Sequence, residues 1–140
     1  MKAIIMAAGQ GTRMGDITKT TPKCLLRYKG EPILKRLITQ LKKYSITDIV
    51  VVVGYKKEDI IKQIDGIQIV ENVNYKNDTN IQSMRLGLQK ATDKEDVIIF
   101  EADIIVEDEL IRYVTGTDFE NKSVNNLHFC FGLLFLDECF

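Results

Sequence analysis

Apolar residues gather in short runs that alternate with stretches of helical spacing along the chain. Residues 3–7 form an apolar run that stops before Gly9, and residues 49–53 form a run of β-branched side chains. Both runs are typical of buried strands in a parallel sheet. Two further strands are expected at residues 67–73 and 97–100, and a short strand at residues 25–28.

Between these runs, apolar residues recur at the three- and four-residue spacing of amphipathic helices. The first helix is expected to begin at Pro32, whose fixed backbone suits a first helical turn, and to end near Lys42 and Lys43. Residues 79–82 have the T-x-x-Q form of a capping box, which predicts the start of another helix. The apolar face of that helix would hold Ile81, Met84, Leu88 and Ala91, and shorter helices are expected at residues 60–64 and 107–114.

Strands separated by helices of this length imply βαβ units with right-handed crossovers. The expected fold is therefore α/β, a mostly parallel sheet with helices on both faces. Because ligands bind beyond the carboxyl ends of the strands in such sheets, polar segments that follow a strand are the candidate sites. Two segments meet this description, residues 8–23 and residues 101–103. Residues 1–115 are expected to form the whole of this core.

Residues 116–140 do not continue the alternation of strands and helices, and they are expected to form an atypical apolar tail of the same domain. Residues 121–140 hold four of the six phenylalanines, and residues 129–136 are nearly all apolar. This leaves two interpretations open, one more buried strand or the hydrophobic end of a truncated chain. The second is favoured, so the sheet is expected to be incomplete at its C-terminus. An apolar tail of this kind would also favour a homo-oligomer.

Composition narrows the classes of function. The chain has 140 residues, and its 45% hydrophobic and 28% charged content is ordinary for a globular protein. A net charge of -1 provides no overall field that would attract nucleic acid or an anionic membrane. Three cysteines without a CxxC pair and a single histidine, His128, argue against a zinc site. Without an export signal or an apolar stretch of roughly 20 residues, a cytoplasmic location without membrane insertion is expected.

The segment after the first strand carries phosphate-binding chemistry. It reads Ala7-Ala8-Gly9-Gln10-Gly11-Thr12-Arg13-Met14-Gly15 and continues as a loop to Pro22-Lys23. Small residues let the backbone approach a ligand closely, and successive free N–H groups form an anion-binding nest. Arg13 and Lys23 add two cations that suit phosphate oxygens. The glycine spacing fits neither a Walker loop nor a dinucleotide-binding fingerprint, so this is a phosphate loop of a different kind.

An acidic pair, Glu101 and Asp103, follows the strand expected at residues 97–100. Alternation along a strand would place both side chains on the same side. Magnesium takes hard oxygen ligands and often only one or two carboxylates, with phosphates and water completing its shell. Asp103 is therefore the better candidate metal ligand, and Glu101 would act through water or a hydrogen bond.

The motif Met6-Ala7-Ala8-Gly9-x-Gly11-x-Arg13-Met14, followed by Pro22-Lys23, resembles the signature of nucleotidyltransferases that activate sugar phosphates and alcohol phosphates. The resemblance extends over about residues 1–115 and implies their Rossmann-like fold. Asn80-x-x-Ser83 and Glu101-x-Asp103 look most like the choline-phosphate cytidylyltransferase branch. The resemblance also implies roles for individual residues. Ala7 would belong to the nucleotide site, and the backbone around Ala8 and Gly9 would contact the base. Gly11, Thr12 and Arg13 would wrap the triphosphate, and Asn80 and Ser83 would lie near the nucleoside. Asp103 would bind Mg²⁺ with help from Glu101.

The function implied is transfer of a nucleotidyl group, CMP as the first choice, from a nucleoside triphosphate to a small phosphate monoester such as phosphocholine or a sugar 1-phosphate. Arg13 would hold the leaving phosphates, and Lys23 would offset the charge between two anions. The nucleophile is already anionic, so no activating histidine or cysteine is needed. Two alternatives remain open: a truncated domain that binds nucleotide without turnover, or a regulatory module.

Overall fold

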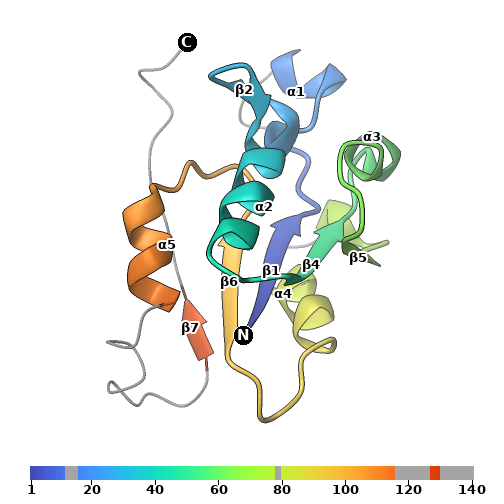
Figure 1. The fold of residues 1–140 in the computed structure, drawn as a ribbon. Coiled ribbons are helices and arrows are strands. Elements are labelled where there is room, and N and C mark those ends of the chain that lie inside the picture. Colours follow the sequence, from blue (N-terminus) through green and yellow to red (C-terminus); the bar gives the residue numbers. More distant parts are fainter. Residues whose placement is uncertain (12–15, 78–79, 116–126, 130–140) are drawn as a thin grey trace.

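The computed structural model of the chain describes residues 1–11, 16–77, 80–115 and 127–129. Within them, five strands form one parallel sheet in the order β5-β4-β1-β6-β7 (Figure 1). β1 lies at the centre, so that Met6 pairs with Val52 of β4 on one side and with Glu101 of β6 on the other. The strands are β1 (Lys2–Ala7), β4 (Asp48–Val53), β5 (Gln68–Glu71), β6 (Val97–Glu101) and β7 (Leu127–Phe129).

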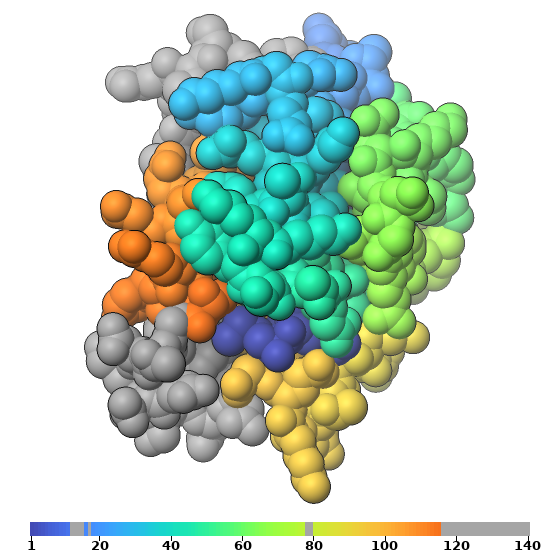
Figure 2. All heavy atoms as spheres, in the orientation of Figure 1, coloured from blue at the N-terminus to red at the C-terminus, as the bar shows by residue number. Residues whose placement is uncertain are grey.

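Different helices cover the two faces of the sheet, because side chains along β1 alternate between them. Ile5 packs in a large core with residues of α2, α3 and α5, whereas Ile4 packs in a smaller core with residues of α4. In the view of Figure 2, α2 lies at the centre of the face, with α5 and α3 on either side of it. The helices are α2 (Ile33–Lys43), α3 (Lys57–Ile61), α4 (Ile81–Leu88) and α5 (Asp108–Thr115). The predicted α/β fold, with a parallel sheet and helices on both faces, is confirmed.

Part of the loop expected at residues 9–23 is helical. The segment contains a short helix, α1 (Asp16–Thr20), in which Asp16 and Lys19 form an ion pair of 2.5 Å one turn apart. A single 3-10 turn, η2 (Lys23–Leu25), follows. The strand expected at residues 25–28 is correspondingly short, since β2 (Arg27–Tyr28) pairs with β3 (Glu31–Pro32) only after this turn. Elements of three to five residues are too short to show an apolar period, so the pattern could not predict them.

The start of α4 differs from the capping-box prediction. Its N-cap residue is Asn80, which makes no capping bond, and the threonine of the predicted box lies outside the described residues. Ile81 is 67% exposed rather than part of the apolar face, whereas Ser83 and Gly87 are buried there. A Cβ atom at Gly87 would lie only 2.4 Å from the Cγ2 atom of Ile4. The helix therefore lies too close to the sheet for large side chains at these positions.

The two edges of the sheet also depart from the expected pattern. β5 ends at Glu71, so Val73, which is 71% exposed, does not extend the strand, and η3 (Tyr75–Asn77) follows. β7 pairs in parallel with β6, and of residues 129–136 only Phe129 lies within the described strand. The rest of the tail lies outside the described residues, so both interpretations of it, and a boundary after residue 115, stay predictions. Among the helices of the described ranges, none is long and apolar enough to cross a bilayer.

Candidate active site

A cleft with a volume of about 270 Å³ lies where β1 and β6 end, as expected for a parallel sheet of this kind. Its walls come from four segments: the end of β1 with the residues after it, the turn η2, the residue before α4, and the end of β6. Figure 1 shows β1 and β6 side by side, running in the same direction. The lining residues are Met6, Ala7, Gly9, Gln10, Gly11, Pro22, Lys23, Cys24, Asn80, Glu101, Ala102 and Asp103.

The backbone after β1 is held by specific bonds on the side away from the cleft. The carbonyl of Ala8, which is buried, accepts a hydrogen bond of 3.1 Å from the backbone N–H of Tyr55. Gly11 has a φ of +66°, a conformation that favours glycine. Its carbonyl accepts a bond of 2.8 Å from the hydroxyl of Thr18 in α1. The glycine-rich segment therefore reaches the cleft with its backbone fixed at two points.

Lys23 enters the cleft from the turn η2, which begins directly after Pro22. Its aliphatic stem lies against Gly11, because a Cβ atom at that glycine would come within 2.8 Å of the lysine Cγ atom. The Nζ atom lies 3.7 Å from the Oδ2 atom of Asp103, and both side chains are partly exposed. The lysine and the candidate metal ligand thus form an ion pair within the cleft.

The acidic pair and Asn80 form the other wall. β6 ends at Glu101, and the N–H of Ala102 still bonds the carbonyl of Met6 at 3.1 Å, so the ladder extends one residue beyond the strand. Both Glu101 and Asp103 line the cleft. The amide of Asn80 donates a hydrogen bond of 3.0 Å to Glu101 Oε1. Burial, and then the negative charge of Asp103, raises the pKa of the Glu101 carboxyl above its ordinary value, while the bond from Asn80 opposes that shift.

Some of the residues expected in the site are not brought to the cleft wall. Ser83 lies on the buried face of α4, where its hydroxyl accepts a hydrogen bond of 2.9 Å from the amide of Asn72. The Ala8 side chain is buried in the same way and does not line the cleft. Thr12 and Arg13 lie outside the described residues, so their expected triphosphate contacts stay predictions. The remaining expected residues, Ala7, Gly9, Gly11, Lys23, Asn80, Glu101 and Asp103, lie together.

The donor set at the end of β6 fits one particular class of metal. Within the described ranges, no group of three or more histidine, cysteine or acidic residues could hold an ion by itself. Two carboxylates on one wall are compatible with magnesium, which is commonly held by one or two carboxylates while phosphates supply further oxygens. Glu101 and Asp103 meet that requirement, with an open cleft beside them for the phosphates.

Cys24 also lines the cleft, although the sequence pattern did not place it in the site. It is buried, and burial, followed by the charge of Asp103, raises the pKa of its thiol to about 12. The thiol is therefore protonated at neutral pH and is no nucleophile. Its position directly after the Pro22-Lys23 pair is the one sequence signal that could have placed it at the site.

Comparisons with known proteins agree with this geometry. Residues 3–120 match the MobA-like NTP transferase domain. A 2-aminoethylphosphonate cytidylyltransferase from Lancefieldella rimae is 39% identical over 112 residues, which cover 78% of this chain and 45% of that protein. A choline-phosphate cytidylyltransferase from Streptococcus pneumoniae is 42% identical over 88 residues, which cover 61% of this chain and 38% of that protein.

The structure of a CTP:phosphocholine cytidylyltransferase from Streptococcus pneumoniae superposes with a TM-score of 0.65 at 36% identity. The match covers 73% of this chain and 44% of that one. The chain therefore spans somewhat less than half the length of these relatives. The resemblance to nucleotidyltransferases and the Rossmann-like fold are confirmed. Because the domain match spans most of the chain, from the first strand to beyond α5, the chain belongs to the MobA-like NTP transferase domain family.

Proposed function

We propose that this chain binds a nucleoside triphosphate, CTP as the first choice, and transfers its nucleotidyl group to a small phosphate monoester with release of pyrophosphate. One observation carries the proposal. Lys23, the amide of Asn80 and the carboxylates of Glu101 and Asp103 converge in one cleft beside the glycine-rich segment after β1. A cation, a polar amide and metal-binding carboxylates around an open backbone are the groups that a triphosphate requires.

In the proposed reaction an oxygen of the acceptor phosphate attacks the α-phosphorus. A new P–O bond forms to the acceptor, the bond to the β-phosphate oxygen breaks, and the electron pair leaves with pyrophosphate. The acceptor oxygen is anionic at neutral pH, so no general base has to remove a proton. Catalysis then depends on positioning and on the neutralisation of charge, which Lys23 provides between the two anions. Arg13, expected to hold the leaving phosphates, would share that task.

We include Mg²⁺ in the proposal, held by Asp103 with Glu101 beside it. The bound ion would neutralise charge on the phosphate oxygens and so favour the transfer. The protein's own part is to keep the carboxylates in place. Asn80 does this for Glu101 through the bond of 3.0 Å, and the bond of 3.1 Å from the N–H of Ala102 to β1 fixes the backbone between the two acids.

The choice of CTP and of the acceptor rests on the relatives. Two of them are named as cytidylyltransferases, one acting on choline phosphate and one on 2-aminoethylphosphonate. Both acceptors combine a phosphate or phosphonate group with a positively charged nitrogen. Phosphocholine is therefore the first acceptor to test and a sugar 1-phosphate the second. The cytoplasmic location and the homo-oligomer expected from the sequence stay predictions.

One alternative has a specific observation in its favour. The matched part covers only 45% and 38% of the two cytidylyltransferases, so more than half of each of those proteins has no counterpart in it. On this alternative the chain binds nucleotide without turning it over. Binding and turnover therefore have to be measured separately.

The first measurement is thermal unfolding with each of the four triphosphates and magnesium. A triphosphate at 100 times its dissociation constant stabilises the folded chain by about 2.7 kcal/mol. CTP is expected to give the largest shift. Asp103→Asn should abolish most of that shift, whereas Asp65→Asn, on an exposed turn far along the chain, should leave it intact. If none of the four triphosphates shifts the transition, the proposed function is wrong.

The second measurement is pyrophosphate release with CTP and a panel containing phosphocholine, 2-aminoethylphosphonate and glucose 1-phosphate. Release that depends on the acceptor and is lost in Asp103→Asn supports the enzyme. Tight CTP binding without release in any combination supports the nucleotide-binding domain instead.

A further inference from the structure

The turn between β4 and α3 contacts α1 at an unusual number of points. The phenol oxygen of Tyr55 lies 3.1 Å from the carbonyl of Thr18 and 3.1 Å from that of Lys19, so its single proton is shared between them. The Nζ atom of Lys56 donates a bond of 2.6 Å to the carbonyl of Thr20. Three successive carbonyls of one short helix are thus bound by two neighbouring side chains.

These hydrogen bonds stabilise α1 from outside the helix. A helix of five residues is far below the length at which helices are stable in isolation, so α1 depends on contacts from outside it. The carbonyls bound by Tyr55 and Lys56 are those of the last three residues of α1. The turn therefore acts as an external cap, and a lysine near a helix C-terminus also interacts favourably with the helix dipole.

The same turn holds the other end of the glycine-rich segment. The backbone N–H of Tyr55 bonds the carbonyl of Ala8 at 3.1 Å, while its phenol oxygen bonds α1. One residue thus fixes the segment where it leaves β1 and again where it returns in α1. Between these points the Thr18 hydroxyl bonds the carbonyl of Gly11, which lines the cleft, at 2.8 Å. Tyr55 is thus linked to Gly11 through Thr18, whose backbone carbonyl and hydroxyl bond the two residues.

The turn has the features of a rigid support. A Cβ atom at Gly54 would lie 2.7 Å from the Cβ of Tyr75 and 2.9 Å from the carbonyl oxygen of Ala8, so only glycine allows this close approach. The rings of Tyr55 and Tyr75 pack at 6.4 Å between centroids. The ammonium of Lys56 lies 5.8 Å from the centre of the Tyr55 ring, within reach of a cation–π interaction.

Lys56 and Lys57 stand side by side in the sequence but have different partners. In the structure Lys56 bonds α1, whereas Lys57 forms an ion pair of 2.7 Å with Glu71 at the end of β5. The two lysines therefore provide a matched pair. Loss of the charge at Lys56 removes a bond to α1, whereas the same loss at Lys57 leaves α1 untouched.

We propose that Tyr55 and Lys56 are positioning residues for nucleotide binding: they hold α1, whose Thr18 hydroxyl bonds the carbonyl of Gly11, and thereby pre-organise the short segment around Gly11 that lines the cleft. The inference rests on the proposed function, since it concerns affinity for the same triphosphate. Without these bonds the segment has to be ordered when the nucleotide binds, and that entropy cost weakens binding. The chemistry of bound nucleotide is unaffected, because neither side chain lines the cleft.

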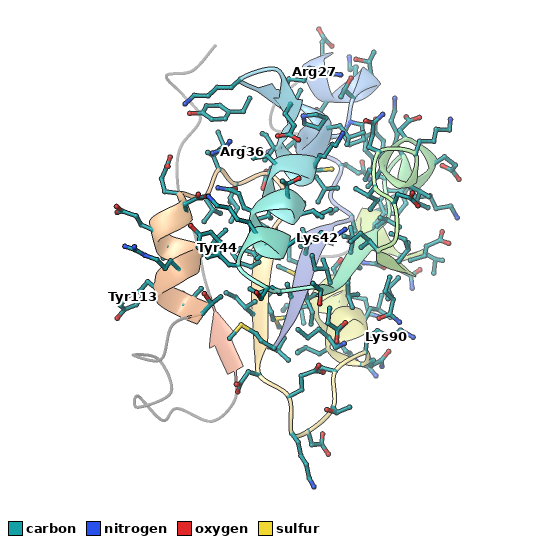
Figure 3. All side chains as sticks on the ribbon, in the orientation of Figure 1. Arg27, Arg36, Lys42, Tyr44, Lys90 and Tyr113 are labelled. Carbon is teal, nitrogen blue, oxygen red and sulfur yellow. The ribbon has the colours of Figure 1, made fainter. Side chains whose placement is uncertain are left out.

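The test compares Tyr55→Phe and Lys56→Met with two controls, Tyr113→Phe and Lys57→Met. Figure 3 shows Tyr113 on α5, on the opposite side of the view from α1 and α3. Titration calorimetry with CTP and magnesium is expected to give a dissociation constant about fivefold higher for Tyr55→Phe and about tenfold higher for Lys56→Met. Both controls should stay within about twofold of the wild type. Lys56→Arg, which keeps a charged donor, should restore most of the affinity.

Two further measurements separate positioning from a general loss of stability. Hydrogen exchange should be faster at residues 16–20 in Tyr55→Phe and Lys56→Met but unchanged in the controls. Where the chain turns over, these variants should raise KM for CTP and leave kcat at saturation unchanged.

Wild-type affinity in Tyr55→Phe and Lys56→Met would overturn the inference while the proposed function stands. A loss in Lys57→Met equal to that in Lys56→Met would overturn it too, because charge rather than the bond would then be responsible. A wild-type chain that binds no triphosphate overturns the proposed function and this inference with it, whatever the exchange rates show.

Discussion

Gly11→Ala tests whether the glycine-rich segment is built around Lys23. Gly11 has a φ of +66°, and an added methyl group would lie 2.8 Å from Cγ, 2.9 Å from Cε and 3.1 Å from Cδ of Lys23. Gly66 offers a matched control, because its φ is +65° and an added methyl group would meet nothing within 4 Å. The two substitutions therefore impose the same backbone conformation on alanine, and only one of them moves the lysine.

The magnitudes follow from that comparison. An L-residue in the left-handed region costs about 1–2 kcal/mol, part of which is offset by the lower entropy of the unfolded chain. Both variants are therefore expected to lose about 1 kcal/mol of unfolding free energy. In Gly11→Ala the lysine stem must also retreat by roughly 0.7–1 Å to restore ordinary carbon–carbon contacts. A charged hydrogen bond to phosphate is worth about 1.5–3 kcal/mol, so CTP binding should weaken by roughly tenfold or more.

Urea unfolding and calorimetric titration with CTP and magnesium measure the two effects on the same samples. Similar losses of stability, with weaker CTP binding only in Gly11→Ala, are the expected result. Equal CTP affinity in the two variants would refute the reasoning, because the displaced lysine would then have no part in binding. Equal weakening of CTP binding in both variants would refute it as well, because backbone strain far from the cleft would then be enough to weaken binding.

Two predictions concern single ionisable groups. Asp108 has its pKa lowered from the ordinary 3.8 by hydrogen bonds from Lys43 and then from Gln40. Stability from this carboxylate is present above pH 3.8 and is lost as the pH falls through its lowered pKa, so Asp108→Asn should lower the urea midpoint at pH 7 and not at pH 2; an equal loss at both would contradict this. Cys24, with its pKa raised to about 12, should react with iodoacetamide at pH 8 only after unfolding, as measured by peptide mass mapping. Equally rapid labelling of Cys24 in the folded chain would contradict its assignment as a buried, protonated thiol.

The central strands could be predicted because their environment is uniform. Residues 49–53 are β-branched throughout and are buried on both faces between β1 and β5, so local propensity and burial indicate the same structure. The carboxyl ends of β1 and β6 then had to meet at one edge, because parallel strands end on the same side. For this reason Lys23, Glu101 and Asp103 could be placed in one site without any knowledge of side-chain contacts.

The elements that the pattern missed depend on contacts from distant parts of the chain. α1 is held by Tyr55 and Lys56, which lie more than 30 residues further along and carry no local signal for it. Met84 and Leu88 of α4 pack against the smaller core as predicted, but Ile81 is exposed. Ser83 and Gly87 are buried instead, because the helix lies very close to the sheet there. Serine and glycine do not count as apolar residues in a hydrophobic pattern. Periodicity therefore cannot predict close packing that depends on small residues.

The position of β1 explains why the cleft depends on packing behind it as well as on the residues that line it. β1 lies between β4 and β6, so the segment that leaves it has the turn after β4 on one side and the end of β6 on the other. From the first side, Tyr55 binds the carbonyl of Ala8, and from the second, the N–H of Ala102 binds Met6. A backbone fixed on both sides cannot adjust much to a ligand, so its shape must already suit the phosphates before they bind. It follows that substitutions in the turn after β4 should alter affinity for nucleotide, whereas those in the acidic pair should alter affinity and turnover together.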